Sequence, residues 1–287
     1  MLDLNLVRDV FPELSNIIPL TGASGQRDVC TAMLGTQKVA LKIFKKTYKA
    51  EQRMEREVSA IVKLNLGCVP KIIDYGKRKI SDEDALFVIE EWIEGKLLSD
   101  YFLEKQPLTF AESLEWGMFL LEACRDFEAK KIVHRDIKPN NIIWGTDGSK
   151  WILDFGIVRH LDLTSLTETA HANGLGTWGY GAPEQMRNIK INIDSRADLF
   201  SVGVVLYECL TGKNPYYEIC ENNLLILMKK MADEDLPALS ILEDSDNKLS
   251  DFLKSLVGRF PSWRPQKAED ALNWFLPIYE SLKVKGV

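Results

Sequence analysis

The sequence has little of what marks secreted, nucleic-acid-binding or membrane-spanning proteins. Its five cysteines are scattered and form no Cys-x-x-Cys pair, which argues against a disulfide framework or a zinc site and indicates a reducing cytoplasm. A formal net charge of −6 with no long basic run argues against a nucleic-acid partner and an anionic membrane surface. The most apolar run, residues 199–210, is too short to span a bilayer and contains Glu208. We therefore expect a cytoplasmic protein with no nucleic-acid or membrane partner.

The chain is long enough, at 287 residues, for one large domain or two lobes that share a cleft. Its first third reads as strands interrupted by one helix, because short β-rich runs are separated by turn-forming residues. The expected strands are residues 17–21, 29–34, 38–44, 71–75 and 85–91, and the expected amphipathic helix is residues 49–64.

Past Gly95 the hydrophobic pattern becomes helical. Thr109 and Glu112 have the spacing of a capping box before a long helix. Asp194 and Gly212 are the start and stop signals of a second long helix. The tail, residues 249–282, reads as helical with a break at 261–265. We therefore predict an α+β fold of two lobes: a β-rich lobe of about residues 1–92 and a mainly helical lobe of about residues 93–287.

The strongest functional signal lies in residues 134–141. Phosphoryl transfer requires an aligned nucleophile, neutralised oxygens and bound metal, and little covalent chemistry from the protein. Asp136 can orient and deprotonate an attacking hydroxyl, and Lys138 can stabilise the transferring phosphate. Asn141, and Asp154 at the start of an Asp-Phe-Gly sequence, offer the oxygen ligands that Mg²⁺ prefers. The combination predicts Mg²⁺-dependent phosphoryl transfer.

These motifs resemble those of the protein kinase superfamily, and the resemblance covers nearly the whole chain. It implies a bilobal kinase fold in which Lys42, in a Val-Ala-Leu-Lys sequence, binds the α- and β-phosphates of ATP. Glu57 is its expected ion-pair partner on the following helix. The resemblance also implies that the backbone of Glu91 and Ile93 contacts ATP. It further implies apolar contacts to ATP from the side chains of Val29, Ala40 and Ile143.

Structural supports follow from the same resemblance. Glu184, in Gly-Ala-Pro-Glu, should pair with Arg264, and Asp198 should brace the loop that carries the catalytic Asp. Lys138 and Thr177 are features of Ser/Thr kinases and imply a protein Ser or Thr hydroxyl as acceptor. The chain looks most like the bacterial branch of these enzymes, using ATP with Mg²⁺ or Mn²⁺. The rival interpretations are a nucleotide-binding pseudokinase and a kinase of small-molecule hydroxyls.

The phosphate loop and the hinge depart from the family pattern. Gly22 is the only one of three motif glycines present, since Ser24 and Arg27 occupy the other two positions. These substitutions would weaken ATP binding, or Arg27 would supply a compensating charge, or the loop tolerates them. The gatekeeper, which is commonly apolar, is either Glu90 or Ile89. A carboxylate at that position would need a partner or a raised pKa.

Regulation is expected on the activation segment. In the family, arginines such as Arg135 and Arg159 gather around a phosphate on this segment. We expect autophosphorylation of one or more of its hydroxyl residues, and dimerisation where that reaction occurs in trans. The candidates are Thr164, Ser165, Thr167 and Thr169.

Overall fold

The computed structural model describes residues 3–20, 27–44, 66–81, 83–104, 107–154, 179–186, 193–217, 223–239, 241 and 244–283. These residues form two compact units that meet in the chain between Glu94 and Gly95. Several expected functional residues lie outside the described ones: Gly22, Glu57, Arg159, Thr164, Ser165, Thr167, Thr169 and Thr177.

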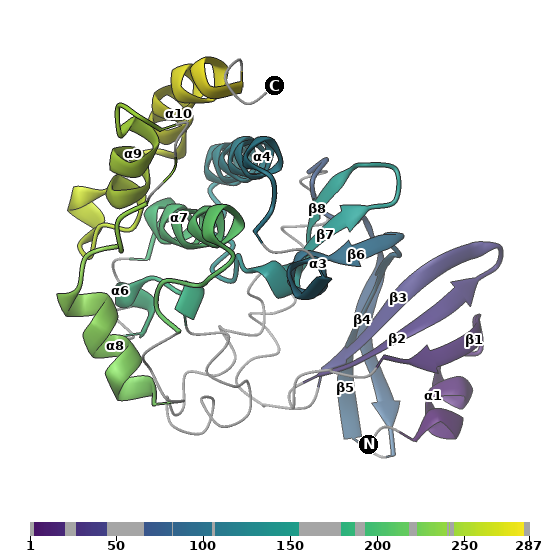
Figure 1. Cartoon of the computed structure of the whole chain (residues 1–287). Coiled ribbons are helices and arrows are strands. Elements are labelled where there is room, and N and C mark those ends of the chain that lie inside the picture. Colours follow the sequence, from purple (N-terminus) through teal and green to yellow (C-terminus); the bar gives the residue numbers. More distant parts are fainter. Residues whose placement is uncertain are drawn as a thin grey trace. The chain divides into compact units, whose positions relative to one another are not determined.

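The first unit contains an antiparallel five-stranded sheet in the order β1-β2-β3-β5-β4 (Figure 1). All five predicted strands are present. Most bounds differ from prediction, and the largest differences are that β1 begins three residues earlier and that β4 continues to Ile80. The strands are β1 Leu14–Pro19, β2 Arg27–Leu34, β3 Gln37–Phe44, β4 Ile72–Ile80 and β5 Glu83–Glu91.

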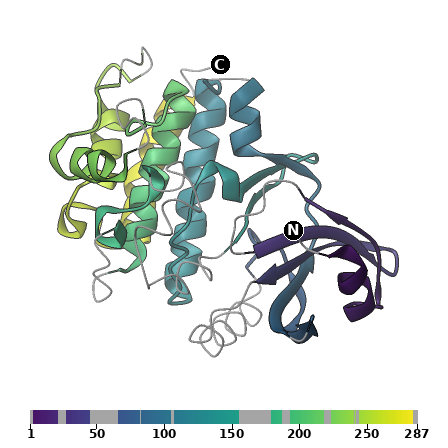
Figure 2. The ribbon, with the colours of Figure 1, turned by 90° about the horizontal axis from the view of Figure 1, so that it is seen from below.

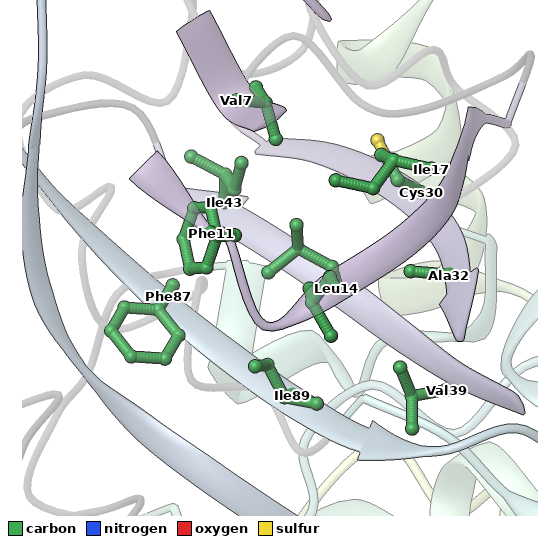
Figure 3. Packing of buried hydrophobic residues seen from close by; sticks show 11 residues of the cluster. Val7, Phe11, Leu14, Ile17, Cys30, Ala32, Val39, Ile43, Phe87 and Ile89 are labelled. Atoms are coloured by element: carbon green, nitrogen blue, oxygen red, sulfur yellow. The ribbon is translucent and has the colours of Figure 1, made fainter. Parts of the chain in front are cut away.

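One face of this sheet is covered by a short helix, α1 (Leu4–Val10), which the sequence pattern did not predict. Val7 and Phe11 are fully buried and pack with strand residues such as Phe87 (Figure 3). Arg78 on β4 holds the end of the helix, since its guanidinium donates to the Val10 carbonyl oxygen at 2.9 Å. The hydrophobic cluster therefore buries this face of the sheet.

The second unit is mainly helical and is built around α4, α7 and α10, which pack against one another (Figure 2). Further elements are two short 3₁₀ turns and a three-stranded antiparallel sheet in the order β6-β7-β8. The helices are α3 Leu98–Glu104, α4 Phe110–Ala129, α6 Pro183–Met186, α7 Ser195–Thr211, α8 Leu224–Asp233, α9 Lys248–Leu256 and α10 Ala268–Lys283. The remaining elements are β6 Gly95–Leu97, η1 Pro139–Asn141, β7 Ile142–Gly145, β8 Lys150–Ile152 and η4 Pro261–Trp263.

The predicted signals at the ends of α4 and α7 are confirmed. Thr109 and Glu112 form a reciprocal capping box at the start of α4. The Asp194 side chain accepts a hydrogen bond from the backbone N–H of Arg196, the second residue of α7. Gly212 ends this helix at φ 75°, a conformation that suits glycine. These local signals fix where the central helices of the unit begin and end.

The small sheet adjoins the candidate site in sequence, because β7 directly follows Asn141 and β8 ends two residues before Asp154. Gly95 permits the approach of β6 to β7, because a Cβ atom there would lie 2.4 Å from the Trp144 carbonyl oxygen. Among the described residues, no helix combines the length and the apolar character needed to cross a membrane.

Candidate active site

A buried carboxylate on α7 fixes the backbone that precedes Asp136. Asp198 is 1% exposed and accepts hydrogen bonds from the N–H groups of His134 and Arg135, each at 2.7 Å. Arg135 has φ 68°, which strains a residue with a side chain. Burial raises the pKa of Asp198 to about 7, and the two N–H donors oppose this rise. Asp198 therefore ties the strained segment to the central helix of the unit.

His134 joins this segment to the residue before Asp154. Its Nδ1 accepts a hydrogen bond from the backbone N–H of Asp136 at 3.3 Å. Because Nδ1 is the acceptor, the neutral ring carries its proton on Nε2. Nε2 then donates to the carbonyl oxygen of Leu153 at 3.0 Å. Burial lowers the pKa of His134 to about 4, so the ring is neutral at pH 7. His134 is thus a structural link and carries no charge into the site.

The Asp136 carboxylate is held at one of its oxygens by two donors. Lys138 Nζ lies 2.9 Å from Oδ2, and Asn141 Nδ2 lies 2.7 Å from the same atom. Asn141 Nδ2 also donates to the Asp136 carbonyl oxygen at 2.9 Å. Because both partners of Nδ2 are acceptors only, the amide orientation is fixed and Asn141 Oδ1 points away from Asp136. The arrangement sets the plane of the carboxylate and brings a cation beside it.

Asp154 is held next to Asn141 through the backbone. The N–H of Leu153 donates to the Asn141 carbonyl oxygen at 2.7 Å. Asp154 itself has φ 56°, the left-handed region that a non-glycine residue rarely adopts, and it is half-buried. The side-chain oxygens of these two residues are hard donors that suit Mg²⁺, so the donor set fits the expected metal.

The supporting ion pair expected between Glu184 and Arg264 is present as two parallel contacts. The guanidinium donates to both carboxylate oxygens, at 2.7 and 2.9 Å, and both residues are buried. Arg264 also donates to the carbonyl oxygens of Gly258 and Arg196. The network links α6, the start of α7 and the loop before α10.

Gln185 is a residue whose contribution the sequence reasoning missed. Its Nε2 donates to the Arg135 carbonyl oxygen at 2.9 Å, and its Oε1 accepts from the Ala182 N–H at 2.9 Å. It therefore connects α6 to the strained segment before Asp136. Its position directly after Glu184 was the one available signal, and that signal does not reveal a contact with a residue fifty positions away.

In the first unit, the strand register places the two gatekeeper candidates on opposite faces of the sheet. Glu90 lies opposite Ala40, and Val88 lies opposite Lys42, so these four side chains share a face. Ile89 points to the other face, into the cluster of Figure 3. Glu90 therefore stands on the Lys42 face, and its carboxylate forms an ion pair with Lys42 Nζ.

The expected apolar contacts for a nucleotide ring are divided between the units. Val29 lies opposite Lys42 and Thr31 opposite Ala40, which places Val29 on the Lys42 face of the sheet. Ile143 lies on β7 of the second unit and is half-buried. Of the two expected hinge residues, Glu91 is half-buried and Ile93 is 8% exposed. The Glu91 N–H donates to the Lys71 carbonyl oxygen at 2.9 Å.

Comparison with known proteins agrees with these motifs. The family model described as "Protein kinase domain" matches residues 21–275. A probable serine/threonine-protein kinase of Clostridium perfringens is 30% identical over 240 residues, which are 82% of this chain and 33% of that protein. Serine/threonine-protein kinase PknL of Mycobacterium tuberculosis is 33% identical over 210 residues, which are 72% of this chain and 50% of that protein. The chain thus spans between a third and a half of the length of these relatives.

Proposed function

Since the chain belongs to the protein kinase family, we propose that it transfers the γ-phosphate of ATP to Ser or Thr hydroxyls of proteins. The observation that carries this proposal is the convergence of Lys138 and Asn141 on one oxygen of Asp136, with Asp154 tethered beside Asn141. The names of the relatives, which are serine/threonine-protein kinases, support this choice of acceptor.

Asp136 orients the acceptor hydroxyl and takes its proton, because its carboxylate plane is already fixed by two donors. Lys138 would stabilise the negative charge on the phosphoryl oxygens during transfer. Asn141 Oδ1 and the Asp154 carboxylate would hold Mg²⁺, with Mn²⁺ as the alternative metal, and the ion would supply positive charge to the phosphate oxygens. The protein thus contributes mainly positioning and fixed charge.

On the first unit, Lys42 binds the α- and β-phosphates, and Val29 and Ala40 contact the adenine ring together with Ile143. Backbone groups of Glu91 and Ile93 bind the adenine edge. The family resemblance also gives roles to three further residues. Glu57 is the ion-pair partner of Lys42, Gly22 belongs to the phosphate loop, and Thr177 docks the substrate.

Regulation of this kinase is proposed through phosphate on the activation segment. Arg135 is held by Asp198, so its position before Asp136 is fixed. Together with Arg159 it would bind phosphate added within residues 164–169, which carry the four candidate hydroxyls. Reaction in trans would bring two copies together, and cytoplasmic protein substrates are expected.

The test is incubation of the purified protein with labelled ATP and Mg²⁺ or Mn²⁺, with a generic protein substrate, followed by mass spectrometry of the label. Asp136→Ala should lower transfer by about 10²–10⁴-fold, because the group that orients the hydroxyl is lost. Asp251→Ala removes an exposed carboxylate on α9 and should leave the rate unchanged.

Label on Ser or Thr in the wild type, lost in Asp136→Ala, supports the proposal. Nucleotide binding without transfer to any protein under either metal would contradict it and favour the pseudokinase. Transfer to a small-molecule hydroxyl but not to protein would favour the second rival.

A further inference from the structure

The strongest observation outside the expected machinery is the ion pair between Lys42 and Glu90. Both residues are almost buried, at 6% and 9% exposed, and both lie on the same face of the first unit's sheet. Lys42 lies directly opposite Val88 rather than Glu90. The lysine side chain therefore reaches diagonally across two neighbouring strands to meet the carboxylate.

The surroundings of the pair make the interaction strong. Beside it on this face lies a small apolar cluster that includes Phe44 and Val88. The opposite face is closed by the cluster around α1 (Figure 3). Charges that are removed from bulk water interact more strongly than exposed ones, and each requires a counter-ion. Glu90 is thus a fixed negative charge in contact with Lys42.

We infer that Glu90 is a specificity-determining residue that competes with nucleotide phosphate for Lys42. This inference rests on the proposed function, in which Lys42 binds the α- and β-phosphates. A phosphate oxygen that contacts Lys42 Nζ comes close to the Glu90 carboxylate, because both anions contact the same ammonium group. The carboxylate therefore reduces the attraction of the site for polyphosphate and leaves its attraction for a neutral nucleoside unchanged.

The test measures binding of ADP, ATP and adenosine to the full chain by calorimetry. Glu90→Gln keeps the size of the side chain and removes its charge. We expect the Kd for ADP and ATP to fall by about three- to tenfold and the Kd for adenosine to stay within twofold of the wild type. Glu83→Gln makes the same chemical change at an exposed position of β5 and should alter none of the three values.

The comparison of ligands separates this role from a merely structural one. A packing defect would change adenosine and ADP binding together, whereas loss of the competing charge changes only the phosphate-bearing ligands. Thermal unfolding establishes that each variant is folded before binding is measured. Glu90→Leu, which also removes the charge, replaces Glu90→Gln where the latter is unfolded, with the same expected preference.

Unchanged or weaker ADP binding by a folded Glu90→Gln protein would overturn the inference while leaving the kinase proposal intact. Failure of the wild type to bind any nucleotide would overturn both. A wild type that binds nucleotide and transfers phosphate, with tighter ADP binding in the variant, supports both.

Discussion

Arg27 places a second positive charge on the sheet face that carries Lys42. It lies opposite Phe44, and Val29 lies opposite Lys42, so Arg27 and Lys42 belong to the same face of neighbouring strands. The alternate residues further along β2, such as Cys30, face the opposite cluster. At the position where the family pattern has a glycine, this chain therefore carries a cation directed to the proposed nucleotide side.

Arg27→Gln should weaken ATP binding, because a positive charge near the phosphates is lost. We expect the KM for ATP to rise by about three- to tenfold with kcat changed less than twofold, since the charge acts on both ground and transition states. Steady-state kinetics at several salt concentrations measure this, and the defect should shrink as salt rises. Arg8→Gln, an exposed change on α1, is the matched control. An unchanged KM would mean that the loop tolerates the missing glycine without help from Arg27.

The pairing of Lys42 with Glu90 shows why residue patterns predict a site only in part. The residue types at 42, 136, 138, 141 and 154 lie in recognisable local sequences, so their chemistry could be predicted. The partner of Lys42 could not, because the contact depends on the register of β3 against β5, which are almost fifty residues apart in sequence. A slip of one residue would have exchanged Glu90 and Ile89 between the two faces.

Among the secondary-structure elements, α4, α7 and α10 are joined at one carboxylate. Glu128, near the end of α4, accepts a hydrogen bond from the Ser195 hydroxyl at the start of α7. Its second oxygen accepts from the backbone N–H of Ala268, the first residue of α10, at 2.8 Å. One side chain therefore accepts hydrogen bonds from the first residues of two helices that are far apart in sequence.

Glu128→Ala should lower the free energy of unfolding by about 1–3 kcal/mol, because a donor at the start of α10 and a hydroxyl on α7 lose their acceptor. Glu122→Ala, an exposed change on the same helix, should shift it by less than about 0.5 kcal/mol. Urea unfolding followed by circular dichroism measures both. A double variant with Ser195→Ala should lose less than the sum of the two single losses. Strict additivity would show that the hydroxyl contact contributes nothing.

The ends of the long helices were predictable, whereas the existence of α1 was not. Thr109, Asp194 and Gly212 act within a few residues of their own helix, so the sequence contains the whole signal. The seven residues of α1 are too few to form a stable helix alone. Its burial depends on the sheet cluster and on Arg78, whose guanidinium lies 4.5 Å from the Phe11 ring, contacts that a local pattern does not contain.

The molecule as a whole carries buried titratable groups whose effects on stability have opposite signs. The pKa of His134 is lowered to about 4 by burial, so its contribution is present above about pH 6.5 and is lost as pH falls toward 4. Burial raises the pKa of Asp198 and of Glu208 to about 7. Their contributions are present at low pH and are lost as pH rises through about 7. Between about pH 4.5 and 6.5 the histidine offsets only one of the two carboxyls, so the free energy of unfolding should fall as pH rises.

Glu208→Gln isolates one of these groups. Glu208 lies on α7 and accepts a hydrogen bond from the Tyr180 hydroxyl, and a glutamine oxygen can accept the same bond. Burial favours the protonated carboxyl, so the wild type loses stability between about pH 4.5 and 7 as the unfolded chain gives up a proton that the folded chain keeps. The variant cannot titrate at this position. Its free energy of unfolding relative to the wild type should therefore rise across this window by up to about 3 kcal/mol and stay constant above pH 8.

Urea unfolding of both proteins at pH 5, 6, 7 and 8 gives this difference directly, and the titration of His134 cancels because both proteins contain it. Glu122→Gln, the same change at an exposed position of α4, should give a difference that hardly depends on pH. A difference for Glu208→Gln that stays flat from pH 5 to 8 would mean that Glu208 is already ionised at pH 5. The buried carboxyl would then be stabilised in its charged form by Tyr180, and the balance with His134 across the molecule would rest on Asp198 alone.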